Sequence, residues 1–315
     1  MLTYSQFAFV AALITVVLAL IAYVWAVAAS HRASTAAPTR TKALVGASGD
    51  LVDELDDLDE APDLQQRARS SSGLSAATLA GYGTTLMRTA FAFLTLCLVL
   101  RAVATGHGPF VTQYEFATSF AWGILAAYAY FEWRYRARTL SLFVLPIAII
   151  AMVYALSWDK AAEPLVPALQ NSVLLTIHIV VAIFAYGAFA VSFATAALTL
   201  WTPQKWRHLV PKDEVLDRIG YRAVVIGFPL DTMVLILGAV WAQIAWGTYW
   251  SWDPKETASL VTWLIYGGYL HARVARGWTG KRAAWLLILG FASVAFTFAG
   301  NAIFGGLHSY ANVNR

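Results

Sequence analysis

Residues 172–200 read SVLLTIHIVVAIFAYGAFAVSFATAALTL, a run of 29 residues without Asp, Glu, Lys or Arg. A helix needs about 20 mainly apolar residues to cross the hydrocarbon core of a bilayer, so this run is long enough to span it. Seven further stretches of similar character raise the number of predicted spans to eight. The eight lie at about 5–29, 85–104, 115–131, 139–157, 172–200, 222–245, 257–275 and 283–304. The sequence therefore predicts an all-α polytopic membrane helix bundle.

The overall composition agrees with a membrane protein. Of the 315 residues, 59% are hydrophobic and 13% are charged, whereas about 25% are charged in typical soluble domains. The net charge of +4 is small, and no nucleic-acid partner is expected. The single cysteine, Cys97, lies inside an apolar stretch. No intrachain disulfide can form, and we expect this thiol to be a small buried apolar group.

The basic residues predict the orientation of the spans. If the eight spans alternate in direction, 18 of the 22 lysines and arginines fall on one side. The positive-inside rule makes that side cytoplasmic. Both the N- and the C-terminus are then predicted to lie outside, as is the loop before the seventh span.

Three regions follow from this pattern. Residues 1–30 are predicted to be an N-terminal transmembrane anchor, because the basic residues follow the apolar segment rather than precede it as in a signal peptide. Residues 31–84 contain GDLVDELDDLDEAPD (49–63), whose acidity favours a disordered cytoplasmic linker. A solvated tether is the simpler interpretation, and a docking site for a cytoplasmic partner is the alternative. Residues 85–315 form the main transmembrane domain.

The most unusual local stretch is WGTYWSWDPKET at residues 246–257. Asp253, Pro254 and Glu256 match a capping box with proline at the first helical position, which would start the seventh span. A belt of Trp and Tyr at the membrane interface would explain one or two of the aromatic rings. Their concentration favours a binding surface for a large planar apolar ligand such as haem or quinone. The rings are Trp241, Trp246, Tyr249, Trp250 and Trp252.

Haem and quinone differ in one requirement, because haem iron needs axial ligands that are most often histidines. His178 in the fifth span and His308 after the eighth fall on the same predicted face as the aromatic stretch. Two imidazoles there could bind one iron from opposite sides, although each could instead be a hydrogen-bonded residue at a helix end. The remaining histidines outside the spans, His31, His107 and His208, are expected to be surface residues.

His271 is expected to lie deeper in the membrane. It follows Asp253 by 18 residues on one helix, which corresponds to about 27 Å, and it shares a helix face with Trp263. An ionisable residue within a span is a candidate functional group, and capping of the helix end is the alternative. Asp231, at a similar predicted depth, could orient His271 or form an ion pair with Arg222 or Arg273. We expect the ion pair.

The stretch WAQIAWGTYWSWDPKETASLVTWLIYGGYLH (241–271) resembles the WWD signature of haem-handling membrane proteins. With eight predicted spans, His178 before it and His308 after it, the chain resembles the CcsA/ResC family of System II cytochrome c biogenesis over about residues 85–310. The resemblance implies delivery of haem b, as a bound substrate, across the bacterial cytoplasmic membrane. The haem would reach an outer site under the WWD loop (residues 241–257) for thioether attachment to the CxxCH segment of apocytochrome c.

The resemblance also implies roles for individual residues. His178 and His308 would be axial ligands of the outer haem, and His271 a ligand of a haem within the membrane whose second ligand comes from a CcsB/ResB-type membrane partner. Lys255 and Arg101 could meet the haem propionates. The other expected cofactor-binding residues are Trp246, Tyr249, Trp250, Trp252, Asp253 and Trp263.

No nucleophile or acid–base pair is evident, so no catalytic residue is predicted. The expected role is that of a subunit of a cytochrome c synthase complex that positions haem. The alternatives are a quinone-binding membrane redox subunit and another WWD-type haem transporter.

Overall fold

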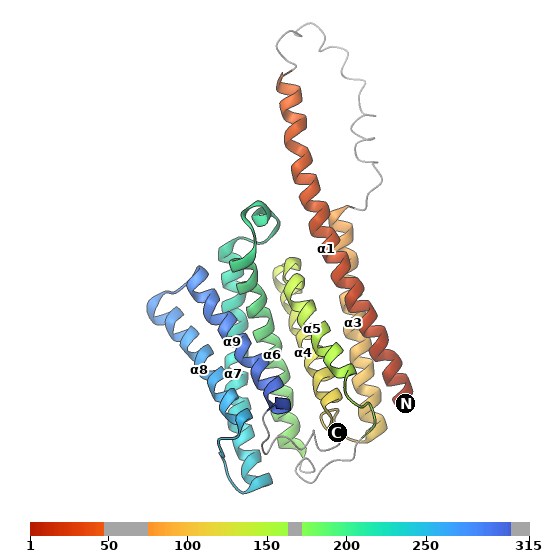
Figure 1. Ribbon diagram of the computed structural model, residues 1–315, viewed down its shortest axis with the longest axis vertical. Coiled ribbons are helices and arrows are strands. Elements are labelled where there is room, and N and C mark those ends of the chain that lie inside the picture. The colour runs from red at the N-terminus through yellow and green to blue at the C-terminus, as the bar shows by residue number, and fades with distance from the viewer. Residues whose placement is uncertain (47–74, 163–171, 304–315) are drawn as a thin grey trace.

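The computed structural model describes residues 1–46, 75–162 and 172–303, and within these ranges the ordered elements are all helices (Figure 1). Six helices are long and apolar enough to cross a membrane by length and composition, and α4 and α8 are outside that set. The predicted all-α polytopic membrane fold is confirmed, while the count of eight spans stays a prediction. The helices are α1 (Leu2–Gly46), α3 (Ala76–Thr105), α4 (Gln113–Tyr135), η2 (Arg138–Leu140), α5 (Ser141–Leu156), α6 (Ser172–Trp201), η4 (Gln204–Leu209), α7 (Asp213–Trp246), α8 (Pro254–Arg276) and α9 (Gly280–Ile303).

Two helices near the N-terminus are longer than the predicted spans. The helix α1 continues to Gly46, and α3 begins at Ala76, where the hydroxyl of Ser75 accepts a hydrogen bond from the Thr78 amide at 3.1 Å. Such a cap gives a hydrogen-bond partner to one of the backbone N–H groups that otherwise have none at the start of a helix. The acidic stretch 49–63 lies outside the described residues, so the predicted linker at 31–84 stays a prediction.

Successive α-helices alternate in direction along the bundle (Figure 1). The connections α4–α5, α6–α7 and α8–α9, which carry the predicted cytoplasmic basic residues, lie at one end, and the connections α3–α4 and α7–α8 lie at the other. The helix α6 is central, because it packs against α4, α5, α7 and α9. This alternation agrees with the predicted topology, and the side of the membrane that each end faces stays a prediction.

The helices α6 and α7 pack closely because glycines of α7 face large side chains of α6. A Cβ atom at Gly227 would lie 2.7 Å from Cε1 of Phe189, and one at Gly238 would lie 2.9 Å from Cε1 of His178. Small residues let helix backbones approach each other in membrane proteins. The position of the His178 ring therefore depends on a missing side chain on the neighbouring helix.

A buried ion pair joins α3 to α4. Nε of Arg101 donates to Oε1 of Glu115 at 2.5 Å, and both side chains are almost fully buried. The other guanidinium nitrogens donate to the carbonyls of Lys160 at 2.9 Å and Ala161 at 2.7 Å. The guanidinium is therefore engaged within the fold, which differs from the predicted role of Arg101 toward haem propionates.

Two predictions about single residues had different outcomes. Cys97 is fully buried, as predicted. The predicted ion pair of Asp231 with Arg222 or Arg273 is wrong. Arg273 donates to both carboxylate oxygens of Asp217, at 2.6 and 2.5 Å. Asp217 lies in the first turns of α7, level with the last turn of α8, whereas Asp231 lies 14 residues further along α7.

Glu115→Gln should destabilise the protein strongly, because it leaves the Arg101 charge buried without a counterion. Removing one partner of a buried pair costs about 3–5 kcal/mol. The free energy of unfolding in detergent micelles measures this effect. The control is Asp213→Asn, which breaks the more exposed Arg207–Asp213 pair and should cost less than about 1 kcal/mol. Equal losses in the two variants would contradict a special role for the buried pair.

Candidate functional site: a cavity beside the α7–α8 loop

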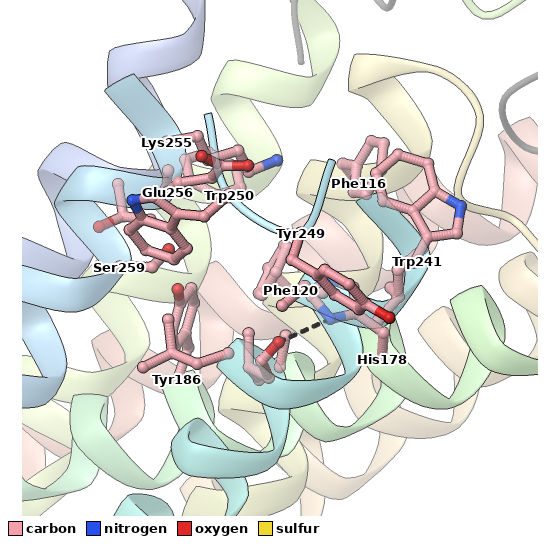
Figure 2. Close-up of a pocket in the computed structure, with 18 of the residues that line it drawn as sticks. Phe116, Phe120, His178, Tyr186, Trp241, Tyr249, Trp250, Lys255, Glu256 and Ser259 are labelled. Atoms are coloured by element: carbon pink, nitrogen blue, oxygen red, sulfur yellow. Dashed lines mark hydrogen bonds between the residues drawn. The ribbon is translucent and has the colours of Figure 1, made fainter. Parts of the chain in front are cut away.

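A cavity lies at the end of the bundle where α7 connects to α8 (Figure 2). About 1050 Å³ within it is not filled by protein atoms, which includes the space open to solvent at its mouth. The lining residues are Gln113, Phe116, Phe120, His178, Ile179, Ala182, Tyr186, Val234, Leu235, Gly238, Ala239, Trp241, Tyr249, Trp250, Lys255, Glu256, Ser259, Thr297 and Phe298.

His178 is fixed against α7 by a hydrogen bond. Its Nδ1 lies 3.0 Å from the carbonyl oxygen of Val234, drawn as the dashed line in Figure 2. A carbonyl only accepts, so Nδ1 carries the hydrogen and a neutral ring has its lone pair on Nε2. Metal-binding histidines usually hold their second nitrogen in this way, which orients the ring. His178 therefore has the tautomer of an imidazole that ligates a metal through Nε2.

Aromatic side chains form the walls of the cavity. Tyr249 and Trp250 come from the α7–α8 loop (residues 247–253) and lie over it, whereas Phe120 comes from α4 (Figure 2). Phe120 stacks on Tyr186 of α6 with ring centres 5.6 Å apart, and the hydroxyl of Tyr186 points toward Ser259. The site thus combines flat apolar surfaces with a few polar groups, which suits a planar apolar ligand.

The geometry of the α7–α8 loop follows from two residues with positive φ. Gly247 ends α7 with φ +77°, and its N–H donates to the carbonyl of Gln243 at 3.0 Å. Trp252 has φ +59°, a left-handed conformation that costs a residue with a side chain about 1–2 kcal/mol. The chain turns there so that Asp253 can begin α8. The loop therefore holds a strained backbone beside the cavity.

The predicted start of the next helix is confirmed. Oδ1 of Asp253 accepts from the Lys255 amide at 2.8 Å, Oε2 of Glu256 accepts from the Asp253 amide at 3.2 Å, and Pro254 occupies the first turn. Oε2 of Glu256 also accepts from the Ser251 amide at 2.8 Å. Both carboxylates thus stabilise the backbone of the loop and of α8.

Among the described residues that line the cavity, Lys255 is the one lysine or arginine. Its ammonium lies 5.6 Å from the ring centre of Phe116. Burial lowers the pKa of Lys255, and the carboxylate of Asp253 opposes this shift. A partly desolvated ammonium at this position would attract an anionic group of a ligand.

The cavity brings together only part of the predicted binding set, namely His178, Tyr249, Trp250 and Lys255. Trp246 packs edge-on against Trp241 with ring centres 4.7 Å apart, and Trp241 is the ring that reaches the lining. Trp252 is 70% exposed and, like Asp253, does not line the cavity. His308 lies outside the described residues.

His271 and Trp263 lie apart from the cavity. His271 is exposed on the side of the bundle formed by α8. Trp263 donates from Nε1 to Oγ1 of Thr232 at 2.9 Å and stacks on Phe228 with ring centres 5.4 Å apart. Within the part of the chain that the structure describes, no group of three or more His, Cys, Asp or Glu side chains could hold a metal ion.

Apart from His178 and Lys255, the polar and aromatic residues that α4, α6 and α8 add to the cavity were not predicted from the sequence. A signal existed in α6, because His178, Ala182 and Tyr186 follow at intervals of four and share one helix face. Phe116 and Phe120 of α4 have the same spacing. A single sequence does not show that these two faces meet.

Comparison with known proteins places the chain among cytochrome c assembly proteins. The family model described as "Cytochrome C assembly protein" matches residues 110–308. The chain is 37% identical over 262 residues to the cytochrome c biogenesis protein CcsA of Guillardia theta, covering 74% of this chain and 86% of that protein. It is 34% identical over 293 residues to CcsA of Gloeobacter violaceus, covering 72% and 86%. For CcsA of Prochlorococcus marinus the identity is 36% over 253 residues, covering 69% and 80%.

Gly238→Ala should lower the stability of the protein, although glycine to alanine normally stabilises a helix by about 1 kcal/mol. The added Cβ would lie 2.9 Å from Cε1 of His178 and would push the ring off its Val234 carbonyl. Gly268→Ala is the control, because its Cβ would meet nothing within 4 Å. Melting temperatures in detergent should fall for the first variant and rise for the second. A rise for both would show that the His178 ring is not confined by Gly238.

Proposed function

Since the chain belongs to the CcsA family of cytochrome c biogenesis proteins, we propose that its cavity holds haem, as a substrate, and presents it to apocytochrome c. Family membership and the apolar helices establish a membrane-embedded protein with a role in cytochrome c maturation. The proposal adds the ligand, the cavity that binds it and the residues that position it.

The proposal rests on the position and hydrogen bonding of His178. Its Nδ1 is held by the Val234 carbonyl, and its ring lines a cavity with aromatic walls. Haem iron is most often ligated by imidazole, and the porphyrin needs flat apolar surfaces; the cavity offers both. Quinone would need the aromatic surfaces but not an imidazole in the ligating tautomer.

A second axial ligand is expected from His308. Thr297 and Phe298 of α9 line the cavity, and the described part of α9 ends at Ile303. Five residues of chain span at most about 18 Å, and we propose that the chain after Ile303 turns back to bring His308 to the cavity. The pair His178 and His308 would keep the iron six-coordinate until the histidine of the CxxCH segment replaces one of them.

The contribution of this chain to thioether formation is positioning. Trp250 and Tyr249 would pack on the porphyrin, and the ammonium of Lys255 would meet a propionate. With these contacts in place, the haem vinyl groups would face the apocytochrome thiols in one orientation. Holding two reactants in a fixed geometry lowers the entropic part of the barrier without a protein nucleophile.

His271 would serve a second haem within the membrane, shared with a CcsB/ResB-type membrane partner. Its side chain is exposed on α8, about 27 Å along the helix from Asp253. A polar imidazole that faces lipid is costly, so a partner helix that supplies the second ligand would also cover it. We propose that haem binds at His271 before it moves to the outer cavity.

Absorption spectroscopy of the purified protein with its membrane partner tests the proposal. The wild type should show the Soret band of six-coordinate haem, and His178→Ala should lose most of the haem of the outer site. His107→Ala is the matched control, because its Nδ1 also lies near a carbonyl, that of Gly108 at 2.9 Å, but its ring does not line the cavity. A haem-free wild type that contains quinone would favour the quinone-binding alternative.

The two tryptophans Trp250 and Trp252 should differ in their effect on haem binding. Trp250→Ala removes a wall of the cavity and should weaken haem affinity about three- to tenfold, the usual worth of one aromatic contact. Trp252→Ala changes a residue that is 70% exposed and should leave affinity within twofold. Haem titrations of both variants measure this difference. A larger loss for Trp252→Ala would mean that the ligand lies outside the cavity.

A further inference from the structure

Asp231 is a buried acid that the proposed haem site does not use. Its side chain is fully buried in α7, and neither carboxylate oxygen has a hydrogen-bond partner among the described residues. An ionised carboxylate is strongly disfavoured in such surroundings, whereas a protonated carboxyl carries no net charge. Buried polar atoms without partners are rare in proteins and call for an explanation.

Asp231 lies next to the cavity on the same side as His178. Asp231, Val234, Leu235 and Gly238 are spaced i, i+3, i+4 and i+7, so they share one face of α7, and the last three line the cavity. The Val234 carbonyl is the group that holds His178. Asp231 therefore lies about one helical turn, roughly 5 Å, behind the hydrogen bond of the proposed iron ligand.

The ionisable groups around Asp231 come from two neighbouring helices. Tyr186 of α6 and Tyr266 of α8 lie close enough to interact with it electrostatically, and the Tyr266 hydroxyl also has no hydrogen-bond partner among the described residues. The helix α9 contributes no ionisable side chain between residues 283 and 298. On α7 itself the nearest charged residue is Arg222, nine residues or about 13 Å away. Among the described residues that line the cavity itself, the charged ones are Lys255 and Glu256 of α8.

We propose that Asp231 holds a proton and exchanges it as the charge on the haem iron changes. This inference rests on the proposed function, because it concerns iron bound at His178. Ferric haem has one more positive charge than ferrous haem. When a one-electron reductant reduces the iron, the carboxylate of Asp231 takes up one proton from water, and oxidation of the iron releases that proton.

The electrostatic reason is the low polarity of the interior. A positive charge at the iron favours the ionised carboxylate, and its removal favours the neutral acid. Interactions between charges are stronger in a buried site than in water, so a carboxyl one turn behind the ligand responds to the iron. Lys255 and Glu256 lie in the first turn of α8, and the carboxylate of Glu256 is occupied by backbone N–H groups. Asp231 is therefore the group best placed to compensate the charge of the iron.

Infrared spectroscopy of the haem-free protein tests the first half of the proposal. The wild type should show the carbonyl stretch of a protonated carboxyl at neutral pH. Asp231→Asn should remove this band, whereas Asp159→Asn, at an exposed loop residue, should leave it unchanged. If the spectra of the wild type and of Asp231→Asn show the same protonated-carboxyl bands, the proposal is overturned.

Redox titration of the haem-loaded protein tests the second half. The reduction equilibrium of the wild type should become less favourable as pH rises, by up to tenfold per pH unit for one proton per electron. Asp231→Asn keeps the size and neutrality of the protonated acid, so it should bind haem normally and flatten this pH dependence. Asp159→Asn should bind haem normally and keep the pH dependence of the wild type. An unchanged pH dependence in Asp231→Asn overturns the coupling.

Two further measurements keep the outcomes distinct. If Asp231→Asn does not fold, the difference infrared spectrum between the oxidised and reduced wild type decides the coupling, because a protonated-carboxyl band must gain intensity on reduction. If the wild type takes up no haem at all, the proposed function fails and the coupling with it. The band of the haem-free protein then still decides whether Asp231 holds a proton.

Discussion

The close packing of α6 against α7 is the contact on which the candidate site depends. Gly227 and Gly238 let the two helices approach, and Phe189 and the His178 ring fill the space that side chains would otherwise take. The same contact sets the hydrogen bond between His178 and the Val234 carbonyl. A wider separation would leave that imidazole free to rotate. The tautomer and orientation of the proposed iron ligand are therefore properties of the helix packing and not of the loop above it.

Buried charge is handled in two different ways in this bundle. Arg101 and Glu115 neutralise each other, and backbone groups satisfy their remaining hydrogen-bonding atoms, so this pair fastens α3, α4 and the start of the α5–α6 connection. Asp231 is buried to the same extent but has neither an ion-pair partner nor a hydrogen bond among the described residues. The paired carboxylate of Glu115 stabilises the fold. The unpaired carboxyl of Asp231 is costly to keep ionised, which is why we assign it a proton and a role beside the cavity.

The fold was largely predictable from the sequence, because long apolar runs allow few structures in a bilayer other than helices. The capping box at Asp253 and the burial of Cys97 also followed from local patterns. The set of residues that line the cavity did not follow from local sequence patterns. From the sequence, the aromatic rings of the α7–α8 loop were expected to form one binding surface. In the structure, the backbone turns at Gly247 and Trp252 direct Trp250 to the cavity and leave Trp252 exposed. The partner of Arg273 was also missed, because an ion pair depends on the relative height of two helices, which sequence distance does not give.

The central claim is that this cavity binds haem through His178. A structure of the purified protein with its membrane partner and haem, determined by electron cryomicroscopy, tests it most directly. We predict porphyrin density in the cavity beneath Trp250, with the iron about 2 Å from Nε2 of His178 and Nδ1 still at the Val234 carbonyl. Haem bound elsewhere in the complex, with lipid or quinone in this cavity, would contradict it.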